Sequence, residues 1–175
     1  IIDHGALAMF HSLLNHPRRG IKKDACWCLS KITTGSVDQI QSVISAGLFP
    51  AVKCLLDSPA DEVKQEAVCC IANAASGGTK EQLRYLADIG ILDPLCRLLT
   101  FNDSVVVTDA LETIGNVLQL GQDDMHEGRR VLQNPYALVL VTNGGYELIQ
   151  ALGEHSNATL RERSVLVIAT FFDFA

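Results

Sequence analysis

The sequence predicts an all-α fold, a right-handed superhelical solenoid of about four stacked three-helix repeats with the first repeat truncated. Residues 24–35 align with residues 66–77 at an offset of 42, and a third copy follows at residues 109–118 at an offset of 43. Each of these copies comes after an apolar segment that ends in a pair of leucines. No alternation of apolar and polar residues competes for these segments, so strands are not predicted.

Each repeat is predicted to contain a short helix, a middle helix that follows a glycine, and a longer third helix. Gly47 and Gly90 suit the ends of the short helices, where a positive φ is needed. Pro50 and Pro94 are expected in the first turn of the middle helices, where a missing amide hydrogen costs nothing. Residues 57–59 and 102–104 are expected to supply turns and N-caps before the third helices.

The fourth repeat is weaker than the others. Gly144 and Gly145 precede an apolar segment, and a last helix is expected at about residues 159–172. Residues 122–134 break the period and are predicted to form a longer loop. The repeats themselves are predicted at residues 1–36, 37–78, 79–121 and 135–175.

A period of about 40–47 residues with two or three helices is typical of armadillo and HEAT repeats. One such unit cannot bury its apolar faces alone, so neighbouring units stack and form a concave groove. Only a stub of a first helix precedes the middle helix of the first repeat, at residues 1–4. We therefore expect the chain to be part of a longer protein with an uncapped N-terminal end.

The composition is that of a folded protein without a membrane-spanning segment. Hydrophobic residues make up 48% of the chain, charged residues make up 19%, and the formal net charge is −6. No apolar run approaches the ~20 residues needed to span a bilayer, and no signal peptide is recognisable. The acidic balance predicts basic partners rather than nucleic acid or an anionic membrane.

All six cysteines lie in apolar helical patterns, which predicts buried, reduced thiols that pack as small hydrophobic side chains. Cys26 and Cys28 are two residues apart on a helix, so they point to different sides and cannot share a tetrahedral metal. Reduced thiols indicate a reducing compartment such as the cytosol or nucleus.

Nothing in the sequence indicates an enzyme. The five histidines are scattered, and none stands with cysteine or aspartate at the spacing of a metal site. Nucleophile, phosphate-loop and zinc-protease motifs are missing from the sequence. We therefore predict no catalytic site, no metal and no cofactor.

Several segments make a closer resemblance visible. Residues 21–30 contain an Asp-Ala-x-Trp pattern, residues 71–82 read Ile-Ala-Asn-Ala-Ala-Ser-Gly-Gly-Thr-Lys-Glu-Gln, and residues 111–118 continue the series. Together with residues 144–172, this order resembles the C-terminal armadillo repeats of importin-α over nearly the whole chain. The resemblance implies a nuclear import adaptor whose groove binds nuclear localisation signals, the short basic peptides of cargo proteins.

The chemistry of such a groove follows from three residue types on one face of the third helices, at positions i−3, i and i+4. A tryptophan offers a wall for a lysine stem and a cation–π contact for its ammonium. An asparagine has both a donor and an acceptor for a peptide backbone. An acidic residue at i−3 can pair with lysine or arginine.

By this resemblance, the first two units match the secondary, or minor, signal site of the family. Lys31 stands where asparagine is expected and Cys69 where tryptophan is expected, so we expect only weak binding of basic peptides. Other readings of these residues stay open: a core tryptophan, asparagines that serve helix ends, and acids on a solvated face. The residues assigned to the groove are Asp24, Trp27 and Lys31 in unit one, Glu66, Cys69 and Asn73 in unit two, and Asp109, Glu112 and Asn116 in unit three.

The resemblance also implies partners and a location. Importin-β would bind through a basic segment that precedes this chain, and an export receptor would bind the C-terminal repeats. The protein would shuttle between cytoplasm and nucleus. The alternative is another armadillo-repeat interaction scaffold, as in signalling, adhesion or ubiquitin-ligase proteins, and the upstream sequence would discriminate between the two.

Overall fold

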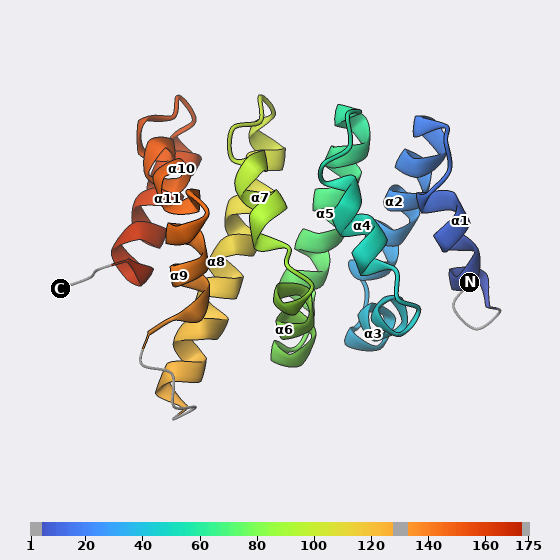
Figure 1. Cartoon of the computed structure of the whole chain (residues 1–175), viewed down its shortest axis with the longest axis horizontal. Coiled ribbons are helices and arrows are strands. Elements are labelled where there is room, and N and C mark those ends of the chain that lie inside the picture. The colour runs from blue at the N-terminus through green and yellow to red at the C-terminus, as the bar shows by residue number, and fades with distance from the viewer. Residues whose placement is uncertain (1–4, 128–132, 173–175) are drawn as a thin grey trace. The chain divides into compact units, whose positions relative to one another are not determined.

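The structure, a computed structural model, describes residues 5–127 and 133–172, and in these residues the only regular elements are helices (Figure 1). The all-α prediction is thus confirmed. The chain divides into two compact units, residues 1–89 and residues 90–175. The division falls within the third repeat, between its short helix and its middle helix.

Unit 1 holds the first two repeats and the short helix of the third. The predicted order of short, middle and long helices is seen in the second repeat, where α3, α4 and α5 follow one another. The elements of unit 1 are η2 (Ala6–Met9), α1 (Phe10–Leu14), α2 (Arg19–Thr33), α3 (Val37–Ser45), α4 (Phe49–Leu55), α5 (Asp61–Gly77) and α6 (Lys80–Asp88).

The short helices α3 and α6 begin in the same way. Ser36 and Thr79 are their N-caps, and each forms a reciprocal capping box with the glutamine three residues later, Gln39 or Gln82. Gly47 follows α3 with φ of 67° and Gly90 follows α6 with φ of 80°. The expected positive φ is therefore confirmed, and the repeat period is visible in the backbone as well as in the sequence.

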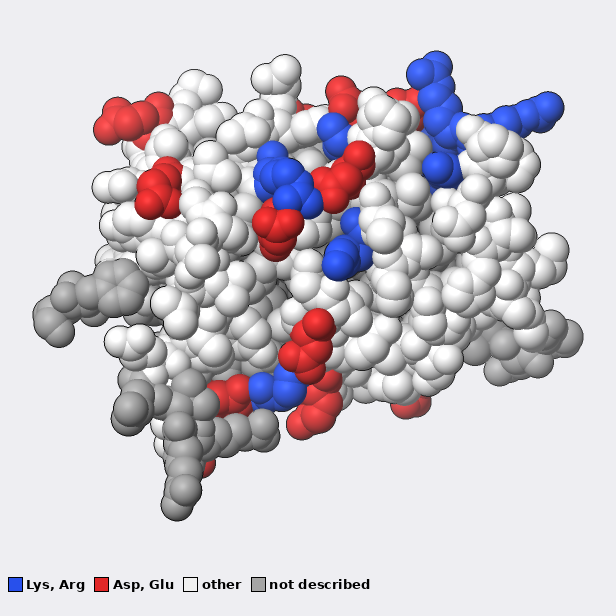
Figure 2. All heavy atoms as spheres, in the orientation of Figure 1, with Lys and Arg blue, Asp and Glu red and all other residues white. Residues whose placement is uncertain are grey.

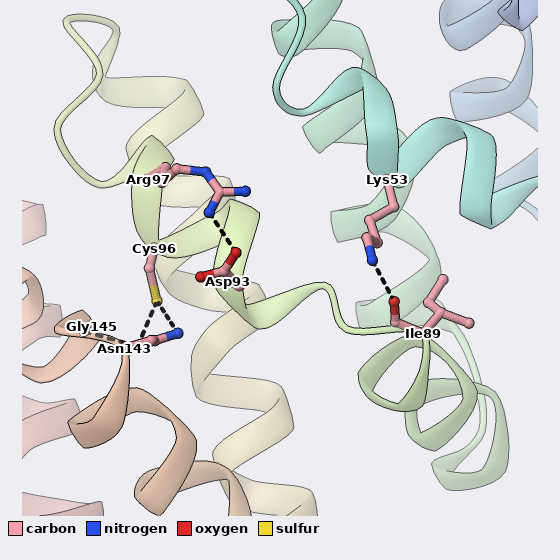
Figure 3. A network of polar contacts seen from close by, with 7 residues as sticks. All are labelled: Lys53, Ile89, Asp93, Cys96, Arg97, Asn143 and Gly145. Carbon is pink, nitrogen blue, oxygen red and sulfur yellow. Dashed lines mark hydrogen bonds and ion pairs between the residues drawn. The ribbon is translucent and has the colours of Figure 1, made fainter.

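The core of unit 1 lies where the long helices α2 and α5 pack against each other. Leu29, Cys26 and Ile71 are fully buried there. The Thr33 hydroxyl crosses between the helices and donates to the carbonyl oxygen of Cys70 at 3.1 Å. On the middle helix, the Lys53 ammonium donates to the carbonyl oxygen of Ile89 at 2.8 Å, which ties α4 to the end of α6 (Figure 3).

Unit 2 completes the third repeat and contains the fourth. The third helix of the third repeat, α8, continues to His126, whereas the sequence predicts that it ends near residue 121. The expected loop at 122–134 is thus partly wrong, and residues 128–132 lie outside the described residues. The elements are α7 (Leu92–Leu98), α8 (Ser104–His126), α9 (Pro135–Thr142), α10 (Gly145–Ala151), η3 (Leu152–Glu154) and α11 (Ala158–Phe171).

Two asparagines connect the helices of unit 2. Buried Asn134 caps α9, and its amide donates to the carbonyl oxygen of Leu118 in α8 at 2.8 Å. A side chain at Gly121 would collide with that amide, because an added Cβ would stand 2.2 Å from the Asn134 Oδ1. Asn143 lies 4.0 Å from the Cys96 sulfur on α7 and accepts from the backbone N–H of Gly145 (Figure 3).

Two expectations need correction. Asp103 caps α8 by accepting from the Val105 N–H at 2.8 Å, as expected, but α5 has Ala60 at its N-cap and no side-chain cap. Ser58 instead accepts from the Ala60 N–H at 3.2 Å and shapes the turn before α5. The thiols also differ from the prediction, because their positions around each helix decide their exposure: Cys26, Cys70 and Cys96 are buried, Cys28 and Cys69 are half-buried, and Cys54 is exposed.

Candidate functional site

The exposed side of α2 carries the three residues assigned to the groove in the first repeat. Asp24, Trp27 and Lys31 are spaced three and four residues apart, so they lie on one helix face. The Trp27 side chain is 49% exposed, so the alternative of a packed core tryptophan is wrong. The Lys31 ammonium lies over the Trp27 ring, 5.5 Å from its centroid, so the ring already holds a cation.

On α5 the corresponding residues are Glu66, Cys69 and Asn73. The Asn73 amide group donates to the Ser30 carbonyl oxygen at 3.2 Å and to the Thr34 hydroxyl at 3.0 Å, and it lies 3.6 Å from the Cys69 sulfur. The Ser30 carbonyl can only accept, so the amide nitrogen must face α2. Asn73 therefore serves as a link between α5 and the end of α2, as one alternative supposed. Its Oδ1 has no partner among the described residues, and it remains available as an acceptor.

Two carboxylates complete this surface, which we call the α2–α5 face: Asp24, Trp27, Lys31, Glu66, Cys69 and Asn73. Asp24 is exposed and Glu66 is half-buried. Within the described part of the chain, neither forms an ion pair or a hydrogen bond. Burial is the main reason that the pKa of the Cys26 thiol rises to about 12, and the negative charge of Glu66 raises it further. Because neither carboxylate has a partner among the described residues, Asp24 and Glu66 can each pair with a cation from a ligand.

In unit 2, Glu112 and Asn116 line an open groove between α8 and α11, which we call the α8–α11 groove. The groove encloses about 360 Å³. Glu112 forms an ion pair with Arg163 across it. Asp109 lies outside this lining, and its pKa is raised by burial and by the charge of Asp103. The lining consists of Leu111, Glu112, Gly115, Asn116, Gln119, Arg163, Leu166, Val167, Thr170 and Phe171.

The α11 side of this groove was missed by the reasoning from sequence. Arg163, Leu166 and Thr170 are spaced three and four residues apart, as are Asp24, Trp27 and Lys31. The same spacing in the fourth repeat is the feature of the sequence that could have indicated this side of the groove. The pattern does not identify these three residues, because none of them is the acid, tryptophan or asparagine that it requires.

The described residues contain no group of three or more His, Cys, Asp and Glu side chains that could hold a metal ion. In the same part of the chain, no helix is both long and apolar enough to cross a membrane. Figure 2 shows Lys and Arg side chains interspersed with Asp and Glu on a largely uncharged surface. The viewed face therefore presents no broad basic patch of the kind that binds nucleic acid.

Comparison with known proteins adds a family model. The Armadillo/beta-catenin-like repeat matches residues 1–34 and 36–76. The match covers the first two repeats, whose long helices are α2 and α5. The prediction of armadillo repeats is confirmed there by a criterion independent of the helix pattern.

Curated relatives include several importin subunits. Importin subunit alpha-3 of Arabidopsis thaliana is 39% identical over 98% of this chain, and importin subunit alpha-1b of Oryza sativa subsp. japonica is 38% identical over 98%. Importin subunit alpha-4 of Arabidopsis thaliana is 36% identical over 90%. The chain covers 33%, 32% and 29% of these relatives, so it spans about a third of their length.

Solved structures with a similar fold include designed armadillo repeat proteins. One, solved in complex with the peptide (KR)4, is 29% identical, with a TM-score of 0.79 over 97% of this chain and 66% of that protein. Another, computationally designed for modular peptide recognition, is 25% identical, with a TM-score of 0.67 over 97% of this chain and 84% of that protein.

Proposed function

Because the chain belongs to the importin-α family of armadillo-repeat proteins, we propose that it is part of a nuclear import adaptor. In this proposal the α2–α5 face binds basic nuclear localisation signals of cargo proteins and performs no catalysis. Importin-β would engage the adaptor outside this chain. An export receptor would bind the fourth repeat, and the whole adaptor would shuttle between cytoplasm and nucleus.

The observation that carries the proposal is the exposed Trp27 on a surface with two carboxylates, Asp24 and Glu66, that have no ion-pair partner among the described residues. A half-exposed tryptophan gives a rigid apolar wall for the stem of a lysine. The carboxylates can pair with its ammonium or with an arginine. The free Oδ1 of Asn73 can accept a backbone N–H from an extended peptide.

Exposed apolar side chains support the proposed contact at the fourth repeat. Val165 and Leu166 on α11 are 60% and 65% exposed. Leu166 lines the α8–α11 groove, while Val165 lies on another side of α11, beside Ile149 and Gly153. Exposed apolar side chains on the last repeat of a solenoid need polar covering or a neighbour. The exposed side of α11 is therefore the part of unit 2 on which we place the receptor.

A peptide titration tests the assignment of the α2–α5 face. The double variant Asp24→Asn with Glu66→Gln should weaken binding of a basic signal peptide by about twofold to tenfold, because each exposed ion pair contributes a few tenths to one kcal/mol. The dissociation constant is measured by isothermal calorimetry and by the fluorescence of Trp27, the single tryptophan of the chain.

The control is Asp38→Asn, which removes one exposed charge from the first turn of α3, away from the α2–α5 face. Circular dichroism must show that every variant is folded. If the double variant binds the peptide as tightly as the unchanged protein, the carboxylates have no role and the assignment of this face is wrong.

A further inference from the structure

The ring of Trp27 is already occupied on one face. The Lys31 ammonium lies 5.5 Å from the ring centroid, within the range of about 6 Å in which a cation is attracted by an aromatic face. Lys31 forms no ion pair within the described residues. A peptide lysine at the same place would meet a like charge at close range, so Lys31 makes this position unfavourable for a second cation.

The charges of the α2–α5 face are unevenly distributed along α2. Asp24 lies toward the start of the face, at the level of Glu66, and Lys31 lies toward its end. Lys23 lies beside Asp24, and Lys22 and Glu66 both act electrostatically on the Cys26 thiol, so this end of α2 carries lysines as well as the two carboxylates. The carboxylates of Asp24 and Glu66 have no ion-pair partner among the described residues, while the Lys31 ammonium lies on the Trp27 ring.

We propose that Lys31 is a specificity-determining residue that makes this face prefer peptides of mixed charge over wholly basic peptides. This inference rests on the proposed function, since it assumes that peptides bind here. The preferred ligand carries a lysine or arginine that pairs with Asp24 and Glu66, and an aspartate or glutamate that pairs with Lys31.

Helix geometry sets the spacing of the two peptide charges. Asp24 and Lys31 are seven residues apart, which corresponds to about 10 Å along the helix. An extended peptide advances about 3.3 Å per residue. For a ligand backbone that runs along α2, its acidic and basic residues are therefore about three positions apart.

The test compares peptides of equal length at an ionic strength of about 0.15 M, where the Debye length is about 8 Å and long-range attraction is reduced. One peptide is wholly basic. The others replace one basic residue by glutamate, two or three positions from a lysine and on either side of it. The measured quantity is the ratio of the mixed-charge affinity to the all-basic affinity. General attraction to this acidic protein differs between the two peptides, so the ratio is compared between protein variants of equal net charge.

Three variants of the whole chain are compared with the unchanged protein. Lys31→Met keeps the apolar stem and removes the charge, so the ratio should fall by about twofold to fivefold. Lys31→Glu reverses the charge, and the ratio should fall further. The matched control is Lys80→Met, an exposed lysine at the first position of α6 and not part of the α2–α5 face, and it should leave the ratio unchanged.

Trp27 fluorescence without any peptide provides an independent readout. If the Lys31 ammonium lies on the ring, Lys31→Met should change the emission of Trp27 while Lys80→Met should not. Unchanged emission in Lys31→Met would overturn the internal contact. If peptides bind but the ratio is the same in all variants, the specificity inference is wrong while the proposed function stands. If no peptide binds any folded variant, the proposed function fails, and the inference fails with it.

Discussion

Three polar side chains assigned to the groove already contact other residues of the protein. Asn73 donates to the end of α2, Lys31 lies on Trp27, and Glu112 pairs with Arg163. Each contact uses part of the binding capacity of the side chain. Asn73 keeps its acceptor, Trp27 has its ring contacted by a cation, and Glu112 has its charge balanced. The binding properties of these residues therefore depend on their neighbours as much as on their type.

The cysteines give a test at the residue scale. Burial raises the pKa of Cys96 to about 11 and of Cys26 to about 12, and it raises the pKa of Cys70 as well. A thiol reacts as its thiolate, so these three should be inert at pH 8 while exposed Cys54 reacts first. A disulfide reagent with an optical readout measures the rates in the folded protein.

Cys54→Ser is the matched variant for this experiment. It should remove the fast phase and leave the slower phases of the half-buried Cys28 and Cys69 in place. Unfolding in denaturant should make all remaining thiols react. A fast phase that persists in Cys54→Ser would show that the exposure of these thiols in solution differs from the structure.

At the scale of elements, short polar motifs decide where helices begin. Ser36 and Thr79 form capping boxes, Asp103 caps α8, and Asn134 and Asn157 cap α9 and α11. A side-chain cap satisfies amide groups that have no partner within the helix. These caps therefore fix the first residue of α3, α6, α8, α9 and α11.

Besides capping α9, Asn134 bonds to the carbonyl oxygen of Leu118 in α8, and this second bond gives a prediction. Asn134→Ala should lower the free energy of unfolding by about 1–3 kcal/mol, because it removes the cap of α9 and the bond to the buried Leu118 carbonyl oxygen. Asn157→Ala is the matched control, since Asn157 caps α11 without a comparable second bond, and about 1 kcal/mol is expected. Urea denaturation measures both. Equal losses would mean that the Leu118 contact contributes nothing.

At the scale of the whole molecule, both compact units bury thiols. Cys26 and Cys70 belong to unit 1 and Cys96 to unit 2. Their pKa values are raised above the ordinary value of 9.0 in the folded protein. Burial also raises the pKa of Tyr85. Stability at alkaline pH is therefore linked to the core of each unit.

The sign of that linkage follows from proton binding. Between pH 9 and about 11, the thiols of the unfolded chain lose their protons while the buried thiols of the folded chain keep them. The unfolded state then binds fewer protons, so stability falls as pH rises. Urea midpoints should decrease between pH 8 and pH 10.5. The decrease should be smaller in Cys96→Ser, whose hydroxyl does not ionise, and an equal decrease would contradict the linkage.

The helical repeats, their order and the glycine turns could be predicted from the sequence, because apolar periodicity, turn chemistry and helix propensity act over a few residues. The spacing of Asp24, Trp27 and Lys31 also predicts one helix face for all three, and the contact between Lys31 and Trp27 agrees with it. The length of α8 could not be predicted, since the polar residues after Gly121 are typical of a loop, whereas the helix continues through them to His126 and buries Asp124. The exposure of Cys54 likewise depended on which side of α4 meets the core.

The sequence by itself determined the period, the helices and the residue types of the candidate face. Only the tertiary structure decided which of these side chains remain available. The donors of Asn73 are used by α2 because α5 packs against it, and Arg163 neutralises Glu112 because α11 lies beside α8. Such pairings depend on distances between segments far apart in the chain. The local sequence pattern carries no information about those distances, because they are set by the packing of the helices.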